Sequence, residues 1–186
     1  MHYDVMQVFF GSLSDATNSL LLVDENRTQL APYLKTAAVF KCPSDQSYAI
    51  RSGVNYPRVR SYSMNEHIGE SSRAPDSRKT YYYKLEDFSR PGPAATIVFL
   101  DEHEDSINDG YFLVGHLSDR SQGWNDVPAS RHSRGANFAF VDGHAERHQW
   151  KDKRTIQPVE RTRKFGLFQS NNPDVAWVHD HATATK

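Results

Sequence analysis

The segment from His132 to Trp150 constrains the fold more than any other part of the chain. Residues 136–141 form a short run rich in apolar and aromatic side chains, Asp142-Gly143 follows, and residues 144–150 alternate in character. Asp-Gly between two such runs is typical of a type I′ turn, in which both residues take a positive φ. The pattern therefore predicts a β-hairpin that gathers three histidines and an aspartate around one turn.

Other segments predict the remainder of a small sheet. Residues 96–100 are β-branched and apolar, and we expect them to form a central strand beside residues 136–141. Residues 111–114 are predicted to be the partner of that strand across a polar loop, and residues 39–42 and 58–65 are predicted to be two further strands. The sheet should be small and antiparallel, with long loops between its strands.

The helices are expected at the two ends of the chain. Residues 16–34 predict one or two short helices. Near the C-terminus, Asn172 suits an N-cap, Pro173 suits the first helical position, and Asp174 suits the first turn, where its charge complements the helix dipole. Together with the sheet, these helices predict an α+β fold.

Composition limits the class of protein. A chain of 186 residues with a net charge of −1 predicts a single domain over residues 1–186, with residues 1–14 as the stub of a missing N-terminal element, and no general attraction for nucleic acid. No run of about 18 apolar residues is present to span a membrane. Cys42 is the only cysteine. It is predicted to be a small buried side chain, since a reactive thiol needs a nearby base.

Five segments, in order along the chain, resemble one known family. The spacing of His132, nine residues and Asp142-Gly143 is similar to the C-terminal H-X9-DG signature of prepilin-type, pseudopilin-like proteins common in Planctomycetes and Verrucomicrobia, a domain of unknown function. The other four segments are Leu30-Ala-Pro-Tyr-Leu-Lys, Val39-Phe-Lys-Cys-Pro-Ser-Asp45, Arg60-Ser-Tyr-Ser-Met-Asn65 and Phe99-Leu-Asp-Glu-His-Glu-Asp-Ser-Ile-Asn-Asp-Gly110.

The resemblance implies a structural role without catalysis. The chain would be the globular head of a pseudopilin-like protein, with a pilin-like fold, in a type II secretion or pilus-like filament. Its partners would be other proteins of that assembly, in the periplasm or outside the cell and associated with the cell surface. Family members begin with a leader and a hydrophobic helix, whereas this chain opens on family-like sequence almost at once. A membrane would therefore be reached only through an N-terminal helix that this chain lacks.

The loop after residues 96–100 is the first candidate metal site. Its carboxylates and one amide are crowded within nine positions, and a hard cation would relieve their mutual repulsion. Calcium is the expected cation, as in the C-terminal loop of major pseudopilins. The alternative is that Asp105, Asn108 and Asp109 cap backbone N–H groups in turns, with the remaining acidic side chains in solvent. The candidate ligands are Asp101, Glu102, Asp105, Asn108 and Asp109.

Histidines of the hairpin segment form the second candidate site. His132, Asp142 and His144 offer imidazole and carboxylate ligands that suit zinc, manganese or iron, and a metal-dependent hydrolase would use them with an open coordination position. A hydrogen-bond network is the alternative, in which Asp142 serves the turn and His132 donates to a loop carbonyl or to an acidic residue such as Asp101 or Asp105.

An extracellular carbohydrate-binding module is the third functional class. Such a module would present an exposed tryptophan as a stacking platform for sugar rings. Trp124, Trp150 and Trp177 are the candidates, and partly buried core positions are the alternative for each of them.

Overall fold

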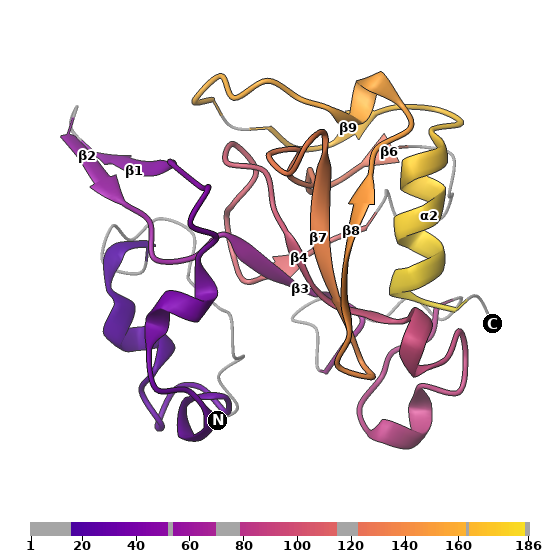
Figure 1. The fold of residues 1–186 in the computed structure, drawn as a ribbon, viewed down its shortest axis with the longest axis horizontal. Coiled ribbons are helices and arrows are strands. Elements are labelled where there is room, and N and C mark those ends of the chain that lie inside the picture. Colours follow the sequence, from indigo (N-terminus) through magenta and orange to yellow (C-terminus); the bar gives the residue numbers. More distant parts are fainter. Residues whose placement is uncertain (1–15, 52–53, 70–78, 115–122, 163, 185–186) are drawn as a thin grey trace.

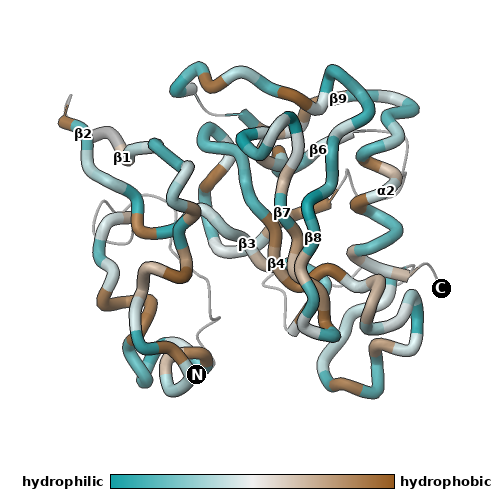
Figure 2. The backbone as a smooth tube through the Cα atoms, in the orientation of Figure 1, coloured by the Kyte–Doolittle hydropathy of each residue, from teal (hydrophilic) through white to brown (hydrophobic). Residues whose placement is uncertain are grey.

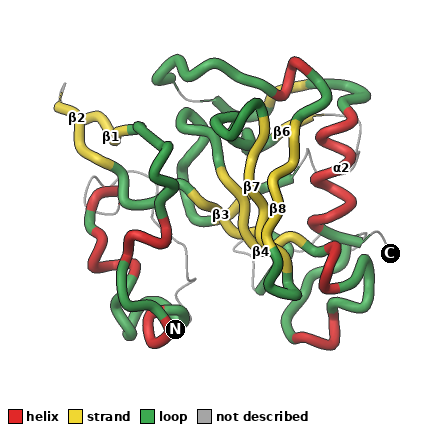
Figure 3. Tube along the Cα trace, in the orientation of Figure 1, coloured by secondary structure: helices red, strands yellow, loops and turns green. Residues whose placement is uncertain are grey.

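The computed structural model describes residues 16–51, 54–69, 79–114, 123–162 and 164–184, and within them the chain has an α+β fold (Figure 1). A five-stranded sheet has the order β5-β3-β4-β7-β8, and two-stranded sheets pair β1 with β2 and β6 with β9. Loops and turns join these elements over much of the chain (Figure 3). The predicted stub over residues 1–14 lies outside the described residues. The strands are β1 Tyr48–Arg51, β2 Val54–Pro57, β3 Tyr62–Asn65, β4 Ile97–Asp101, β5 Tyr111–Phe112, β6 Gly123–Trp124, β7 Gly135–Phe140, β8 Ala145–Gln149 and β9 Leu167–Phe168.

The predicted hairpin is confirmed as β7 and β8, but its predicted turn type is wrong. The two strands pair antiparallel from Gly135 opposite Gln149 to Ala139 opposite Ala145. Of the two central residues only Gly143 has a positive φ, of 91°. The Gly143 N–H donates to the Phe140 carbonyl at 3.0 Å, and the Phe140 N–H donates to the His144 carbonyl at 2.9 Å. This is the longer hairpin loop that ends in a left-handed glycine, so one positive φ is sufficient.

The centre of the sheet is β4, which lies between β3 and β7. Its antiparallel pairing with β7 confirms the predicted neighbours. The predicted pairing of residues 111–114 with β4 is wrong, because β5 pairs in parallel with β3 and occupies the edge of the sheet. Figure 2 shows hydrophobic residues along β4 and β7, whereas β8 is more hydrophilic. Because β5 lies beyond β3, the loop over residues 101–110, called the acidic loop below, carries the chain from the end of β4 to the far side of β3.

The C-terminal helix, α2, covers one face of the sheet and runs over Pro173–Ala182 as predicted. The Asn172 side chain accepts a hydrogen bond from the Asp174 N–H at 2.8 Å, which is an N-cap, and Pro173 occupies the first turn. Val175 and Val178 are fully buried in the main core, which also contains side chains of β4, β7 and the residue after β8. Within the described residues, no helix is both long and apolar enough to cross a membrane.

Three short 3₁₀ helices within residues 19–40 lie on the opposite side of the sheet from α2 (Figure 1). They confirm the predicted N-terminal helices, but the predicted strand at residues 39–42 is wrong, because residues 37–40 form a 3₁₀ turn capped by Thr36. Phe40 packs with Leu22 in a second apolar cluster, against Phe99 of β4. Between these helices and the sheet lies a mainly apolar pocket of about 350 Å³. The 3₁₀ helices are η1 Ser19–Leu22, η2 Ala31–Tyr33, η3 Ala37–Phe40, η4 Leu85–Asp87, η5 Pro93–Ala95 and η6 Lys153–Thr155.

Candidate functional site

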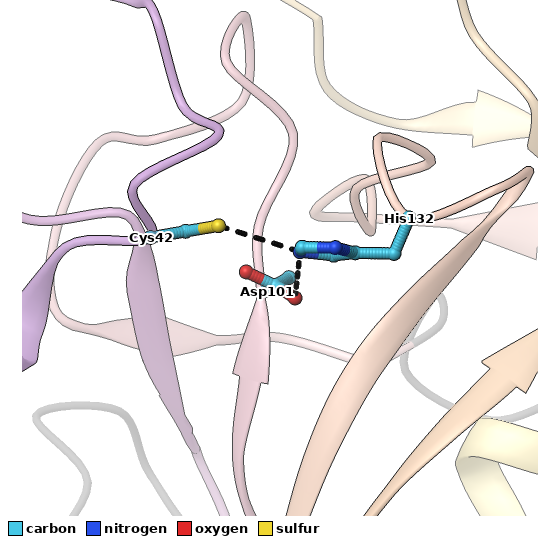
Figure 4. Close-up of side chains that lie close together, drawn as sticks. All are labelled: Cys42, Asp101 and His132. Atoms are coloured by element: carbon cyan, nitrogen blue, oxygen red, sulfur yellow. Dashed lines mark hydrogen bonds and ion pairs between the residues drawn. The ribbon is translucent and has the colours of Figure 1, made fainter.

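Three side chains from distant parts of the sequence converge at the end of β4 (Figure 4). The Cys42 Sγ lies 3.4 Å from the His132 Nε2, and that same nitrogen lies 3.2 Å from the Asp101 Oδ2. These three atoms all lie within 4.8 Å of one another. Cys42 and Asp101 are buried, whereas 20% of the His132 side chain is exposed. They are the only group of three potential cysteine, histidine or carboxylate ligands that the described residues bring together.

Local structure fixes each member of this group. Cys42 follows η3, and its backbone N–H donates to the Ser61 Oγ at 2.7 Å. Asp101 is the last residue of β4. His132 lies in the turn before β7, where the next two residues have φ values of 51° and 63°, and its N–H donates to the carbonyl of residue 135. Thus an N-terminal segment, the central strand and the hairpin each contribute one side chain.

The Asp101 carboxylate is held by donors from two further segments. Its Oδ2 accepts the Asn137 N–H at 2.9 Å, and its Oδ1 accepts from the Arg131 guanidinium at 3.1 Å. Burial raises the pKa of Asp101, which the Asn137 N–H and the Arg131 charge oppose. Burial alone would lower the pKa of Arg131, but its contacts with Glu104 and Asp101 raise it. The guanidinium therefore stays charged and anchors the carboxylate.

The shared Nε2 decides which chemistry this group can perform. In a nucleophile–histidine–acid triad, the acid binds one imidazole nitrogen and the other accepts the proton of the nucleophile. Here Cys42 and Asp101 both contact Nε2. The group is therefore not arranged for thiol catalysis. Three ligand atoms that surround one point suit a metal ion or a shared hydrogen bond instead.

The acidic loop does not gather its oxygens. Asp105 Oδ2 accepts the Glu160 N–H at 2.7 Å, Asn108 Oδ1 accepts the Asp109 N–H at 2.6 Å, and Asp109 Oδ1 accepts the Tyr111 N–H at 2.9 Å. The contacts of Asn108 and Asp109 match the capping alternative, whereas Asp105 binds a segment 55 positions away. The expectation that the remaining acidic side chains lie in solvent is wrong for Asp101 and Glu102, which are buried. Carboxylates of the described loop residues do not form a group of three potential ligands, so a calcium site here stays a prediction without a gathered ligand set.

The hairpin residues are also separated. His144 Nδ1 lies 2.6 Å from the Asp142 Oδ1, and its ring stacks on Phe140 at 4.3 Å. His132 lies at the other end of β7, and a six-residue strand spans about 20 Å. The structure therefore does not bring His132, Asp142 and His144 into one site, and the hydrolase that would use them has no common metal position.

The tryptophans do not form a platform for sugars. Trp124 and Trp150 are 1% and 4% exposed, and both belong to the main core. Trp177 is partly buried between His148, at a ring distance of 3.7 Å, and His181, at 4.2 Å. Trp124 and Trp150 are therefore core residues, which was the alternative to a sugar-binding role, and Trp177 packs against that core.

Glu102, in the acidic loop, and Asp126 form a buried pair of carboxyl groups. Glu102 is fully buried and accepts from the Ser63 hydroxyl, near the buried Arg60 guanidinium. Asp126 accepts the Leu113 N–H at 2.6 Å. Burial raises the pKa of Glu102 to about 7, and burial together with the charge of Glu102 raises the pKa of Asp126 to about 9.

These raised pKa values predict a pH-dependent stability. Between the pKa of an unfolded aspartate, about 4, and about 9, the folded protein keeps a proton on Asp126 that the unfolded chain releases. Stability from this group is therefore lost as the pH rises through that window. Asp126→Asn keeps an acceptor for Leu113 and removes the titration, so its melting temperature should exceed that of the wild type increasingly as the pH rises.

Thermal melts of both proteins at intervals from pH 5 to pH 9 would measure this difference. Burial lowers the pKa values of His103 and His148, which weakens the wild type below about pH 6.5. The difference between variants, in which that effect cancels, is therefore the quantity to compare. The exposed Glu25→Gln is the control and should follow the wild type at every pH. A constant difference for Asp126→Asn would contradict the prediction.

Sequence reasoning missed Cys42 and Arg131 as members of the site. The base that it required near Cys42 exists, but it comes from 90 positions away. The usable signal was a single cysteine in a chain that also offers a histidine and an aspartate in other motifs. Arg131 gave no signal beyond its position next to His132.

No family model, no curated protein and no solved structure matches this chain. The resemblance to pseudopilin-like proteins therefore rests on the five sequence segments themselves. The structure adds the contacts that those segments make with one another in the fold.

Proposed function

We propose that this chain is the non-catalytic globular head of a pseudopilin-like protein, a structural component of a type II secretion or pilus-like filament. One observation carries the proposal: four of the five segments that resemble the family meet in a single buried polar network. The fifth, at residues 30–35, lines the adjoining apolar pocket through Leu30 and Leu34. The motif residues therefore hold the fold together.

The network can be followed from one segment to the next. The Ser61 N–H donates to the Phe40 carbonyl and the Ser61 carbonyl accepts the Glu102 N–H, both at 3.0 Å. Ser63 then binds the Glu102 carboxylate, and Asp101 contacts His132. These contacts join a 3₁₀ turn, two strands and a hairpin, and such connections make a globular head rigid.

The proposed filament role implies which proteins are the partners of the head and where in the cell it lies. Its partners are other proteins of the filament or secretion assembly, and its place is the periplasm or the cell surface. Membrane attachment in this proposal depends on an apolar segment joined to the N-terminal side of the head.

The decisive experiment is to determine the N-terminus and the cellular fraction of the native protein in its host. Intact-mass and peptide analysis of the membrane fraction should find a longer chain, with an apolar segment of about 20 residues before the head. Extracellular protease should degrade the head in cells with a permeabilised outer envelope and an intact inner membrane. A native chain that begins at Met1 and stays inside such cells would contradict the proposal.

A further inference from the structure

We propose that Cys42, Asp101 and His132 form a zinc site in this protein. The site is independent of the filament role, and it differs from both sites expected from the sequence, because Cys42 supplies the thiolate and the acidic loop supplies only its first residue. Three donors of different chemistry, on three separate segments, enclose one point at the end of β4 (Figure 4).

Two of the three distances between the donors match those around a tetrahedral zinc ion, and all three ligand atoms lie within 4.8 Å of one another. Zinc lies at about 2.3 Å from sulfur, 2.0–2.1 Å from a histidine nitrogen and 2.0–2.2 Å from a carboxylate oxygen. Tetrahedral angles then place sulfur and nitrogen about 3.5 Å apart, and nitrogen and oxygen about 3.3 Å apart. The observed separations, 3.4 Å for Cys42 Sγ to His132 Nε2 and 3.2 Å for His132 Nε2 to Asp101 Oδ2, need very little adjustment.

The donor set selects the metal. Thiolate and imidazole disfavour calcium and magnesium, which prefer oxygen, and a mixed sulfur, nitrogen and oxygen set suits zinc. Binding releases the thiol proton of Cys42 to solvent, and neutral His132 then carries its proton on Nδ1. One thiolate and one carboxylate balance the two charges of the ion, so the buried site is neutral. No oxidation or reduction takes part.

The surroundings hold the ligands in place and leave access from one side. The Asn137 N–H and the Arg131 guanidinium fix the Asp101 carboxylate, and the Ser61 hydroxyl fixes the Cys42 backbone. Such contacts outside the ligands orient a metal site and raise its affinity. The partly exposed His132 side chain gives solvent a route to the ion. Three protein ligands leave a fourth position for water.

Cobalt substitution and zinc competition test this site on the untagged protein. Co²⁺ should give a thiolate-to-cobalt charge-transfer band together with the strong visible bands of a tetrahedral ion, and zinc should displace it with one equivalent per chain. Cys42→Ser should lose the charge-transfer band. Its zinc affinity, measured against a chromophoric chelator, should fall by more than the roughly 10–100-fold typical of losing an outer contact. Asp101→Asn should also weaken binding.

The control is a histidine with a carboxylate partner outside the site. His144→Ala removes the contact with Asp142 and should leave both the cobalt spectrum and the zinc affinity unchanged. Asp101 is buried, so a variant that fails to fold would not test the site. The wild type offers a measurement that needs no variant. Cys42 is the only thiol, so the rate of its alkylation reports on this site alone, and zinc should suppress that rate.

Two outcomes would overturn the proposal. One is a cobalt complex without a thiolate band, or zinc that leaves the alkylation of Cys42 unchanged. The other is a loss of binding in His144→Ala with normal binding in Cys42→Ser, which would place the metal at the hairpin turn instead.

Discussion

Gly135→Ala should destabilise the protein by more than about 3 kcal/mol, at the upper end of the range for overpacked cores. A Cβ at this position would lie 2.1 Å from the His148 carbonyl oxygen and 3.1 Å from the Gln149 Cα. Both atoms belong to the backbone of β8, so no side-chain rotation can relieve the overlap. The two strands must separate at the end of the hairpin where His132 lies.

Thermal unfolding would measure this effect, with the other hairpin glycine as a matched control. A loss of 3 kcal/mol lowers the melting temperature of a domain of this size by about 6–12 °C. Gly143 has a φ of 91° but nothing within 4 Å of its Cβ position. Gly143→Ala should therefore cost only the backbone strain, roughly 1–2 kcal/mol. If the two variants melt together, the close approach of β7 and β8 at Gly135 is not what limits stability.

Most parts of this fold that the sequence predicted correctly are encoded by neighbouring residues, and the exception is the pairing of β4 with β7, which the apolar character of both segments indicated. The β7–β8 hairpin and helix α2 each follow from residues within a few positions, such as Asn172 and Pro173 at the start of the helix. The predicted strand at residues 39–42 failed for the opposite reason. Its Phe40 side chain packs against Leu22 and Phe99 from a 3₁₀ turn, so tertiary contacts outweighed local preference.

The candidate site shows the same division between local and distant information. Capping by Asn108 and Asp109 could be proposed from the sequence, because turn residues bind backbone groups one or two positions away, whereas the Asp105 contact with Glu160 spans 55 positions. The contact between Cys42 and His132 depends on the order of strands in the sheet, which periodicity does not encode. The parallel pairing of β5 with β3, which was not predicted, is another consequence of that order.

Asp174→Ala should cost about 3 kcal/mol or more, although its sequence position suggested only a favourable charge in the first turn of α2. The side chain is completely buried. Its two oxygens accept the N–H groups of Lys151 and Asp152, each at 2.9 Å, and the Thr155 hydroxyl at 2.8 Å. Removing the carboxylate leaves one buried and two partly buried donors without an acceptor, and a buried donor without an acceptor costs about 1–3 kcal/mol.

The size of the loss separates two roles for this carboxylate. A charge that acts only on the helix dipole contributes about 0.3–1 kcal/mol and is screened by salt, whereas an anchor for the segment after β8 contributes several times more. Urea unfolding at low and high salt would measure both quantities. The exposed Asp180→Ala, in the last turn of the same helix, is the control and should change stability by no more than about 0.5 kcal/mol. A salt-sensitive loss below 1 kcal/mol in Asp174→Ala would reduce Asp174 to the dipole role. A larger loss that salt does not change would mean that Asp174 anchors the segment after β8 to the start of α2.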